Sequence, residues 1–114
     1  MHEYSLVQSL VSRVEAEVRS HRATAVHRVV VSVGELAGVD PALFRTAYDT
    51  FREGTACAGA ELELREVAAR WTCPGCGRDI ARGEVLSCAP CGLPARLAPG
   101  GDEMRLETVE LEVP

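Results

Sequence analysis

Four of the five cysteines form two closely spaced pairs that could hold a metal ion. The pairs are Cys73 with Cys76 in Cys-Pro-Gly-Cys-Gly, and Cys88 with Cys91 in Cys-Ala-Pro-Cys-Gly. A Cys-x-x-Cys turn places two sulfurs on the same side of the backbone, and two such turns supply the four thiolates of a tetrahedral site. The glycine after each pair permits the positive φ that closes the turn, and backbone amides can point at the thiolates. The spacing therefore predicts a zinc-ribbon site.

Two disulfides, or a redox-active dithiol, are the simplest alternatives to this metal site. An odd cysteine count, metal-ligand spacing and an N-terminus that does not resemble a signal peptide favour reduced thiols in the cytoplasm. Zinc is favoured over iron, although four thiolates do not by themselves exclude a rubredoxin-like iron site. Because four protein ligands leave no open coordination position, the metal is expected to be structural or regulatory rather than hydrolytic.

The N-terminal sequence Met1-His2-Glu3 offers a second set of metal ligands. Methionine removal normally needs a small second residue, so we expect Met1 to stay and to provide a free α-amine. The first amides of a helix have no intrahelical acceptor and can serve as ligands without breaking a backbone hydrogen bond. An amine, an imidazole and amide nitrogens form the square-planar set that suits Ni²⁺ or Cu²⁺. The ordinary alternative is a frayed terminus with no role.

Composition narrows the class of protein. The chain has 114 residues, 46% of them hydrophobic, and a formal net charge of −5, which four thiolates and one Zn²⁺ would bring to −7. Such an acidic chain lacks the basic surface that nucleic-acid binding requires. No apolar run approaches the length needed to span a membrane. We therefore expect one small soluble protein, made of a core domain and a metal lobe.

Hydrophobic periodicity predicts five elements around the cysteine segment. Apolar residues at three- and four-residue spacing indicate two amphipathic helices, and β-branched or alternating runs indicate three strands. Along the chain these are a helix over 3–22, a strand over 27–33, a helix beginning after Asp40, a strand over 60–67 and a strand over 104–113.

Three local signals refine this interpretation. Asp40 followed by Pro41 is a helix N-cap with proline at the first helical position, and Gly54 ends that helix. The helix carries most of the aromatic residues, so it is expected to anchor the core. Leu106 is out of phase with the apolar residues that follow it, which predicts a bulge or turn near Thr108.

The predicted fold class is α+β, with two helices on one face of a three-stranded sheet and an inserted zinc-ribbon lobe. Residues 1–68 and 100–114 would form the nickel-binding α/β domain and residues 69–99 the zinc-ribbon domain. We expect the lobe to grow from the tip of a hairpin formed by the second and third strands, because this needs no crossing connections.

Both metal motifs, taken together, resemble the HypA/HybF family of nickel metallochaperones for [NiFe]-hydrogenase maturation. The likeness rests on Met1-His2-Glu3 at the head of a helix, the two Cys-x-x-Cys-Gly motifs, the Val-x-Val-Gly-Glu-Leu segment over 31–36 and the final acidic strand. It covers nearly the whole chain. The second cysteine pair departs slightly, because Ala89 stands where the family more often has proline.

The resemblance implies a nickel site and a zinc site but no catalytic residues. Nickel would be bound by the Met1 amine, the His2 side chain and backbone, and a backbone nitrogen near Glu3. Zinc would be bound by the four cysteines of the two pairs. The implied partners are a nickel-handling GTPase, the hydrogenase large-subunit precursor and, in some organisms, urease maturation proteins. Asp40 is a candidate to hydrogen-bond His2 if the two helix N-termini lie together.

Two other functions and three further residues fit the same sequence. A zinc-ribbon adaptor in transcription, associated with nucleic acid, is the alternative function, and an iron-containing redox protein is the third. His21 and His27 are expected to be structural, since one lies near a helix C-terminus and the other begins a strand. Cys57 is expected to be a buried thiol without a partner.

Overall fold

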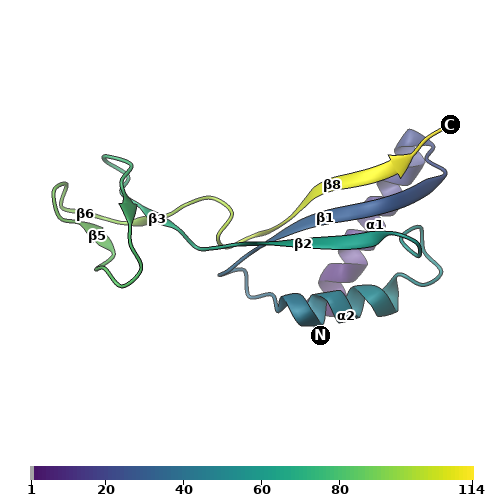
Figure 1. Cartoon of the computed structure of the whole chain (residues 1–114), viewed down its shortest axis with the longest axis horizontal. Helices are drawn as coiled ribbons and strands as arrows, with labels where there is room; N and C mark the ends of the chain where they lie inside the picture. Colours follow the sequence, from purple (N-terminus) through teal and green to yellow (C-terminus); the bar gives the residue numbers. More distant parts are fainter. Residues whose placement is uncertain (1) are drawn as a thin grey trace.

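The computed structural model describes residues 2–114 and shows an elongated molecule, with extents of 56 × 30 × 16 Å. A sheet covered by two helices makes up one end, and a small lobe of short strands makes up the other (Figure 1). The helices are α1 (His2–His21) and α2 (Pro41–Phe51), and the long strands are β1 (Ala25–Gly34), β2 (Glu61–Val67) and β8 (Met104–Glu112). This arrangement confirms the predicted α+β class. Within residues 2–114, neither helix is both long and apolar enough to span a membrane.

Strand order is where the structure departs from the sequence-based prediction. The order is β2-β1-β8, with β2 parallel and β8 antiparallel to β1, so the expected hairpin between the second and third strands is wrong. The valine-rich β1 is buried at nearly every position of its second half, which places it at the centre of the sheet. α2 connects β1 to β2, so these two parallel strands and the helix between them form a βαβ unit.

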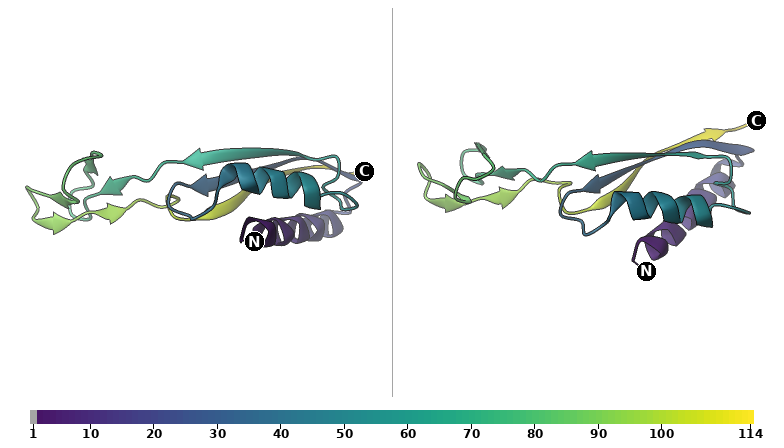
Figure 2. Two further views of the ribbon diagram at one scale, coloured as in Figure 1. Left: turned by 90° about the horizontal axis from the view of Figure 1, so that it is seen from below. Right: turned by 60° about the horizontal axis from the view of Figure 1, so that its bottom comes forward.

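Both helices cover the same face of the sheet (Figure 2). The core between the two layers consists of the apolar residues of both helices and one face of β1, and the aromatic residues of α2 are fully buried within it, except the half-buried Phe51. Its main members are Val7, Leu10, Val11, Val14, Val29, Val31, Val33, Phe44 and Tyr48. Each such side chain contributes about 1.5–3 kcal/mol on burial.

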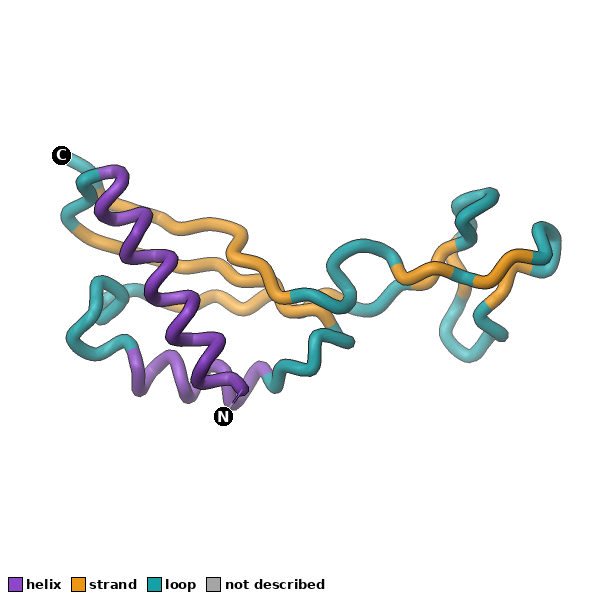
Figure 3. The backbone as a smooth tube through the Cα atoms, turned by 180° about the vertical axis from the view of Figure 1, so that it is seen from behind, coloured by secondary structure: helices purple, strands orange, loops and turns teal. Residues whose placement is uncertain are grey.

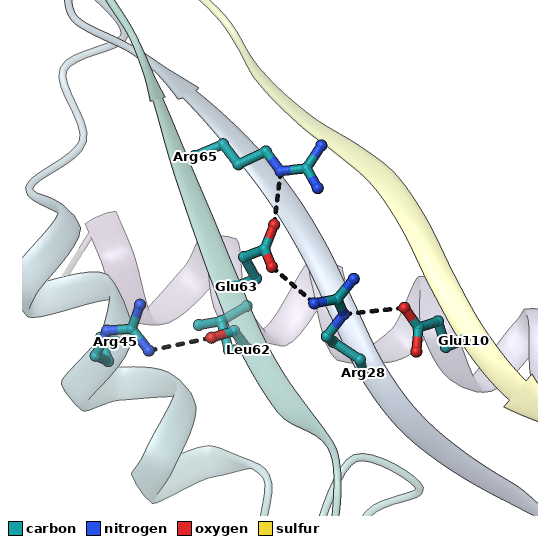
Figure 4. A network of polar contacts seen from close by, with 6 residues as sticks. All are labelled: Arg28, Arg45, Leu62, Glu63, Arg65 and Glu110. Carbon is teal, nitrogen blue, oxygen red and sulfur yellow. Dashed lines mark hydrogen bonds and ion pairs between the residues drawn. The ribbon is translucent and has the colours of Figure 1, made fainter.

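The opposite face of the sheet carries charged side chains linked in a network. Arg28 on β1 donates to Glu63 on β2 at 2.8 Å and to Glu110 on β8 at 2.9 Å, and Arg65 donates to Glu63 (Figure 4). Arg28 therefore bridges all three strands. These side chains are at least one-third exposed, so their contribution is mainly to strand register rather than to net stability.

The predicted bulge lies in β8. Val30 of β1 pairs with Thr108, whereas the next residue, Val31, pairs with Leu106, so Glu107 is the extra residue. Its carboxylate accepts a hydrogen bond from the Ser32 hydroxyl at 2.8 Å, which holds it on the charged face.

The lobe is built from five two-residue strands. These are β3 (Trp71–Thr72), β4 (Asp79–Ile80), β5 (Ser87–Cys88), β6 (Leu93–Pro94) and β7 (Arg96–Leu97). They form a three-stranded sheet in the order β4-β3-β7 and a separate β5-β6 hairpin. The apolar cluster of the lobe contains only two cysteines and Ile80, with Trp71 and Ala95 packed beside them. So small a core cannot by itself hold the lobe folded.

The junction between sheet and lobe is tightly packed around Gly34, the last residue of β1. Both connections to the lobe pass here, and the Gly34 amide donates to the carbonyl of Glu103 at 2.9 Å. A Cβ atom on Gly34 would lie 2.4 Å from the carbonyl oxygen of Gly100 and 2.5 Å from that of Gly101. Only glycine fits, because backbone atoms rather than mobile side chains occupy the space.

We predict that Gly34→Ala lowers the free energy of unfolding by about 1–3 kcal/mol, since the returning backbone must move to admit the methyl group. The matched control is Gly59→Ala, where a Cβ would meet nothing within 4 Å. That variant should stay within about 1 kcal/mol of the parent. Urea unfolding followed by circular dichroism measures both. Equal midpoints for the two variants would contradict the tight junction.

Candidate metal centres

Each cysteine pair forms the turn of a short hairpin in the lobe. Cys73 and Cys76 lie between β3 and β4, whereas Cys88 ends β5 and Cys91 precedes β6. The Gly77 amide donates to the Cys73 carbonyl at 2.9 Å, and the Gly92 amide donates to the Cys88 carbonyl at 2.7 Å. Both glycines have positive φ, 77° and 64°, as the sequence predicts for turns of this kind.

The two turns face each other and bring the four sulfurs together. All four Sγ atoms lie within 4.8 Å of one another, and those of Cys76 and Cys88 are 3.9 Å apart. A tetrahedral zinc site with Zn–S bonds of about 2.3 Å requires sulfurs about 3.8 Å apart. Cys73 and Cys88 are buried, whereas Cys76 and Cys91 are exposed on the outside of the lobe. The cluster is therefore suited to a zinc ion in both donor type and spacing.

Backbone amides favour the thiolate at the first cysteine of each pair. The N–H groups of Cys76 and Gly75 lower the pKa of Cys73 to about 6, and the Gly75 amide lies 3.3 Å from its sulfur. The Cys91 amide, aided by the Arg78 guanidinium, lowers the pKa of Cys88. These are the donors that stabilise charge in a thiolate site.

The fourth sulfur shows why a cation belongs in the cluster. The Cys91 thiol shares hydrogen bonds with the sulfurs of Cys73, Cys76 and Cys88, which raise its pKa to about 12. Four thiolates this close repel one another, so they do not all ionise at neutral pH without a positive charge between them. A divalent ion supplies that charge and would stabilise all four.

The other candidate centre lies at the beginning of α1. His2 is the first residue of this helix and its side chain is 60% exposed, with Nδ1 3.8 Å from a Glu3 carboxylate oxygen. Met1, the other sequence-predicted ligand, lies outside the described residues. The imidazole is thus accessible to a ligand from solvent, at a helix end whose first amides have no intrahelical acceptor.

Glu3 joins the N-termini of the two helices. Its side chain is only 12% exposed, and its carboxylate accepts a hydrogen bond from the Asp40 amide at 3.2 Å. This amide lowers the pKa of Glu3 below its usual range. Asp40 caps α2 as predicted, because its Oδ1 accepts from the amides of Ala42 and Leu43 at 2.9 and 3.2 Å. Sequence reasoning anticipated the cap but missed the Glu3 contact, which depends on how the helices pack.

A second contact that sequence reasoning missed connects the lobe to the sheet. Glu35 directly follows β1, and its carboxylate accepts hydrogen bonds from the Ala69 amide at 2.8 Å and from the Arg82 guanidinium of the lobe. Arg82 and the Ala69 amide lower the pKa of Glu35. An acidic residue at a strand end is too common a feature to reveal such a partner 47 residues away.

The other histidines and Cys57 lie outside both candidate metal centres. His21 lies 3.2 Å from Glu17 on the same helix, and His27 lies 3.2 Å from Glu112 across the sheet. Cys57 is fully buried, and burial raises the pKa of its thiol. The structure thus groups the four cysteines of the two pairs in the lobe. It brings His2, Glu3 and Asp40 together at the beginning of α1, at the opposite end of this helix from His21.

Comparison with known proteins decides the family. The family model described as "Hydrogenase/urease nickel incorporation, metallochaperone, hypA" matches residues 1–111. The chain belongs to the HypA family. It is 40% identical to the hydrogenase maturation factor HypA of Aquifex aeolicus over 114 residues, covering 99% of both chains, and 36% identical to that of Wolinella succinogenes, covering 98% and 96%.

Solved structures of the family share the fold. The solution structure of the Ni metallochaperone HypA from Helicobacter pylori matches this HypA-family chain with a TM-score of 0.70 and 30% identity, covering 98% of each chain. A second HypA solution structure matches with a TM-score of 0.77 and 32% identity, covering 97% and 96%. The resemblance inferred from the two metal motifs is confirmed.

We predict that Cys73→Ser or Cys88→Ser releases the bound metal and unfolds residues 69–99, because metal binding and folding of so small a lobe are coupled. The α/β core does not contact the cluster and should keep its helical circular dichroism. Cys57→Ala serves as the control, since it removes a thiol but no ligand. Metal analysis and amide NMR spectra distinguish these results. A lobe that stays folded and metal-loaded in both serine variants would contradict the assignment.

Proposed function

We propose that this chain binds Ni²⁺ at its N-terminus and delivers it for [NiFe]-hydrogenase maturation, while a zinc ion holds the lobe folded. The observation that carries the proposal is an exposed His2 at the first position of α1, on a chain matched by a nickel-incorporation family over residues 1–111. Nickel is the cargo, so the protein acts by binding and release and needs no catalytic residue.

The nickel ligands in this proposal are nitrogen atoms. They are the α-amine of Met1, the imidazole and backbone nitrogen of His2, and the backbone nitrogen of Glu3. The Glu3 carboxylate is engaged with the Asp40 amide, which favours the backbone rather than the side chain of Glu3 as the ligand. Nitrogen donors in a plane suit Ni²⁺.

Asp40 belongs to the proposal as a group that orients His2. Its Oδ1 is used by the helix cap, and for Oδ2 no hydrogen bond is recorded within residues 2–114. The Glu3 contact with the Asp40 amide brings the beginning of α2 to the end of α1 where His2 lies. A carboxylate that accepts from a ligating imidazole fixes the ring and raises its basicity.

In this proposal each of the two parts of the structure binds a different metal. Residues 1–68 and 100–114 form the nickel-binding domain, and residues 69–99, with Cys73, Cys76, Cys88 and Cys91, form the zinc-ribbon domain. Partners are a nickel-handling maturation GTPase, the hydrogenase large-subunit precursor and urease maturation proteins. Four cysteines spaced for a metal ion rather than paired in disulfides favour a reducing compartment such as the cytoplasm.

The test compares untagged protein with a variant that carries Gly-Ser before Met1 and with His2→Ala. The extension keeps the imidazole but replaces the amine next to it with a peptide nitrogen. We expect both changes to weaken nickel binding at least about tenfold, which corresponds to about 1.4 kcal/mol, as measured by isothermal titration calorimetry.

His21→Ala is the matched control, since His21 is exposed to a similar degree but lies at the other end of α1. It should leave nickel affinity unchanged, and all variants should keep their metal in the lobe. Full nickel affinity in the extended protein would exclude the terminal amine as a ligand and withdraw the proposed site.

A further inference from the structure

The two edges of the main sheet differ in how their backbone groups are used. Along β2, side chains of α2 and of the residue that ends it bond to backbone carbonyls. Arg45 donates to the Leu62 carbonyl at 3.1 Å (Figure 4), and Tyr48 and Arg52 donate to the Ala60 carbonyl at 2.8 and 2.9 Å. Another strand would need these carbonyls, so the β2 edge is protected against pairing.

The β8 edge is open. Within residues 2–114, β8 pairs with β1 alone. The carbonyls of Glu103 and Glu112 accept hydrogen bonds from the amides of Gly34 and Thr24, so the backbone groups of these two glutamates point toward β1. Backbone groups of successive strand residues point to opposite sides, and the bulge separates the two halves of β8. The groups that point away from β1 therefore belong to Met104, Leu106, Val109 and Leu111.

The same four residues form the apolar side of the edge. Their side chains face the helices and stay half-exposed, although Val29 and Val31, on the same side of β1, are fully buried. Two clefts of about 220 and 120 Å³ lie between α1 and β8, and Arg13 and Leu106 line both. Figure 3 shows α1 crossing the sheet diagonally toward the end of β8. Outward backbone groups and partly uncovered apolar side chains thus lie together on this edge.

The charged face of this edge is acidic. β8 and the residue before it contain four glutamates and one arginine, Arg105. Glu110 and Glu112 remain 46% and 60% exposed, although a basic side chain of β1 lies beside each. At the clefts on the helix-facing side, Arg13 and Glu17 balance each other in charge. A strand that fits this edge therefore has apolar side chains toward the helices and cations on the charged face.

We propose that the β8 edge binds an extended peptide segment of another protein, in which apolar residues alternate with lysine or arginine. The peptide runs antiparallel to β8, because antiparallel pairing is the more stable arrangement per residue. Its apolar residues lie opposite Leu106 and Val109 and exchange hydrogen bonds with them, as in other cases where a strand is added to a sheet edge. Its cations lie beside Glu110 and Glu112. None of the proposed nickel ligands lines the clefts, so peptide binding is separate from nickel binding.

Fluorescence anisotropy of a labelled synthetic peptide, titrated with the untagged, metal-loaded full chain, tests the proposal. The probe is a ten-residue peptide that alternates valine and lysine, with both ends blocked. Two isomers carry N-methyl groups either on every valine or on every lysine, so their composition and charge are identical. In the antiparallel pairing only the valine amides point at β8. Methylation of the valines should therefore weaken binding at least about tenfold relative to methylation of the lysines.

A charge change on the edge tests the partner's chemistry. Arg105→Glu replaces the one cation of β8 with a further carboxylate and should tighten binding of the valine–lysine peptide roughly two- to fivefold. A gain in affinity cannot come from a variant that fails to fold. Arg96→Glu makes the same change in net charge on an exposed residue of the lobe strand β7 and should have little effect. A peptide that alternates valine with glutamate should not bind the parent.

Amide hydrogen exchange locates the bound peptide. The four outward amides of β8 should exchange quickly in the free protein and become protected when the valine–lysine peptide binds. The proposal is overturned if this peptide does not bind, if the two methylated isomers bind equally, or if Arg105→Glu and Arg96→Glu act alike. It is also overturned if the peptide binds while these amides stay unprotected. Amides that are already protected without peptide would overturn it as well, since a second copy of the chain would then cover the edge.

Discussion

Val29, Val31 and Val33 of β1 pack in one core with both helices, and the positions of α1, α2, β2 and β8 follow from their burial. A strand this apolar must have neighbours on both sides as well as a covered face. The βαβ connection through α2 supplies one neighbour, and the returning chain supplies the other. β2 and β8 therefore lie on opposite sides of β1. The chain enters the lobe after β2 and returns from it into β8, so both connections meet beyond the end of β1.

This convergence explains how a lobe with almost no core stays attached in a defined way. Gly34 admits the returning backbone, and Glu35 holds the first connection through the Ala69 amide and the lobe through Arg82. Within the lobe, a metal ion held by the sulfur cluster would supply the free energy of folding that so little apolar surface cannot. The lobe is thus ordered from within by the cysteines and from outside by the end of β1.

The two candidate metal centres use backbone amides in different ways. In the lobe, amides of the Cys-x-x-Cys turns stabilise thiolates that are fixed in place. At the start of α1, backbone nitrogens that have no intrahelical acceptor are themselves among the proposed nickel ligands, and His2 lies on the surface. A closed thiolate site retains its ion, whereas a site at an exposed chain end can release one. The proposed function uses both properties, because it needs one site that keeps its metal and another that transfers nickel.

The sequence by itself determined the two helices, the three long strands and the two cysteine turns, because each depends on residues close together in the chain. Periodicity located the two helices, Asp40 marked the start of α2, the phase of Leu106 indicated the bulge, and the cysteine spacing indicated the two turns that bring four sulfurs together. Only the tertiary structure decided which strand lies in the centre, that Glu3 contacts Asp40, and that Glu35 meets Arg82. The strand order and these two contacts depend on which distant segments become buried against one another. A local sequence pattern does not contain that information. The pairing of β8 with β1 also decided which sheet edge stays open. The alternation of apolar and polar residues in a strand does not show which strand lies beside it.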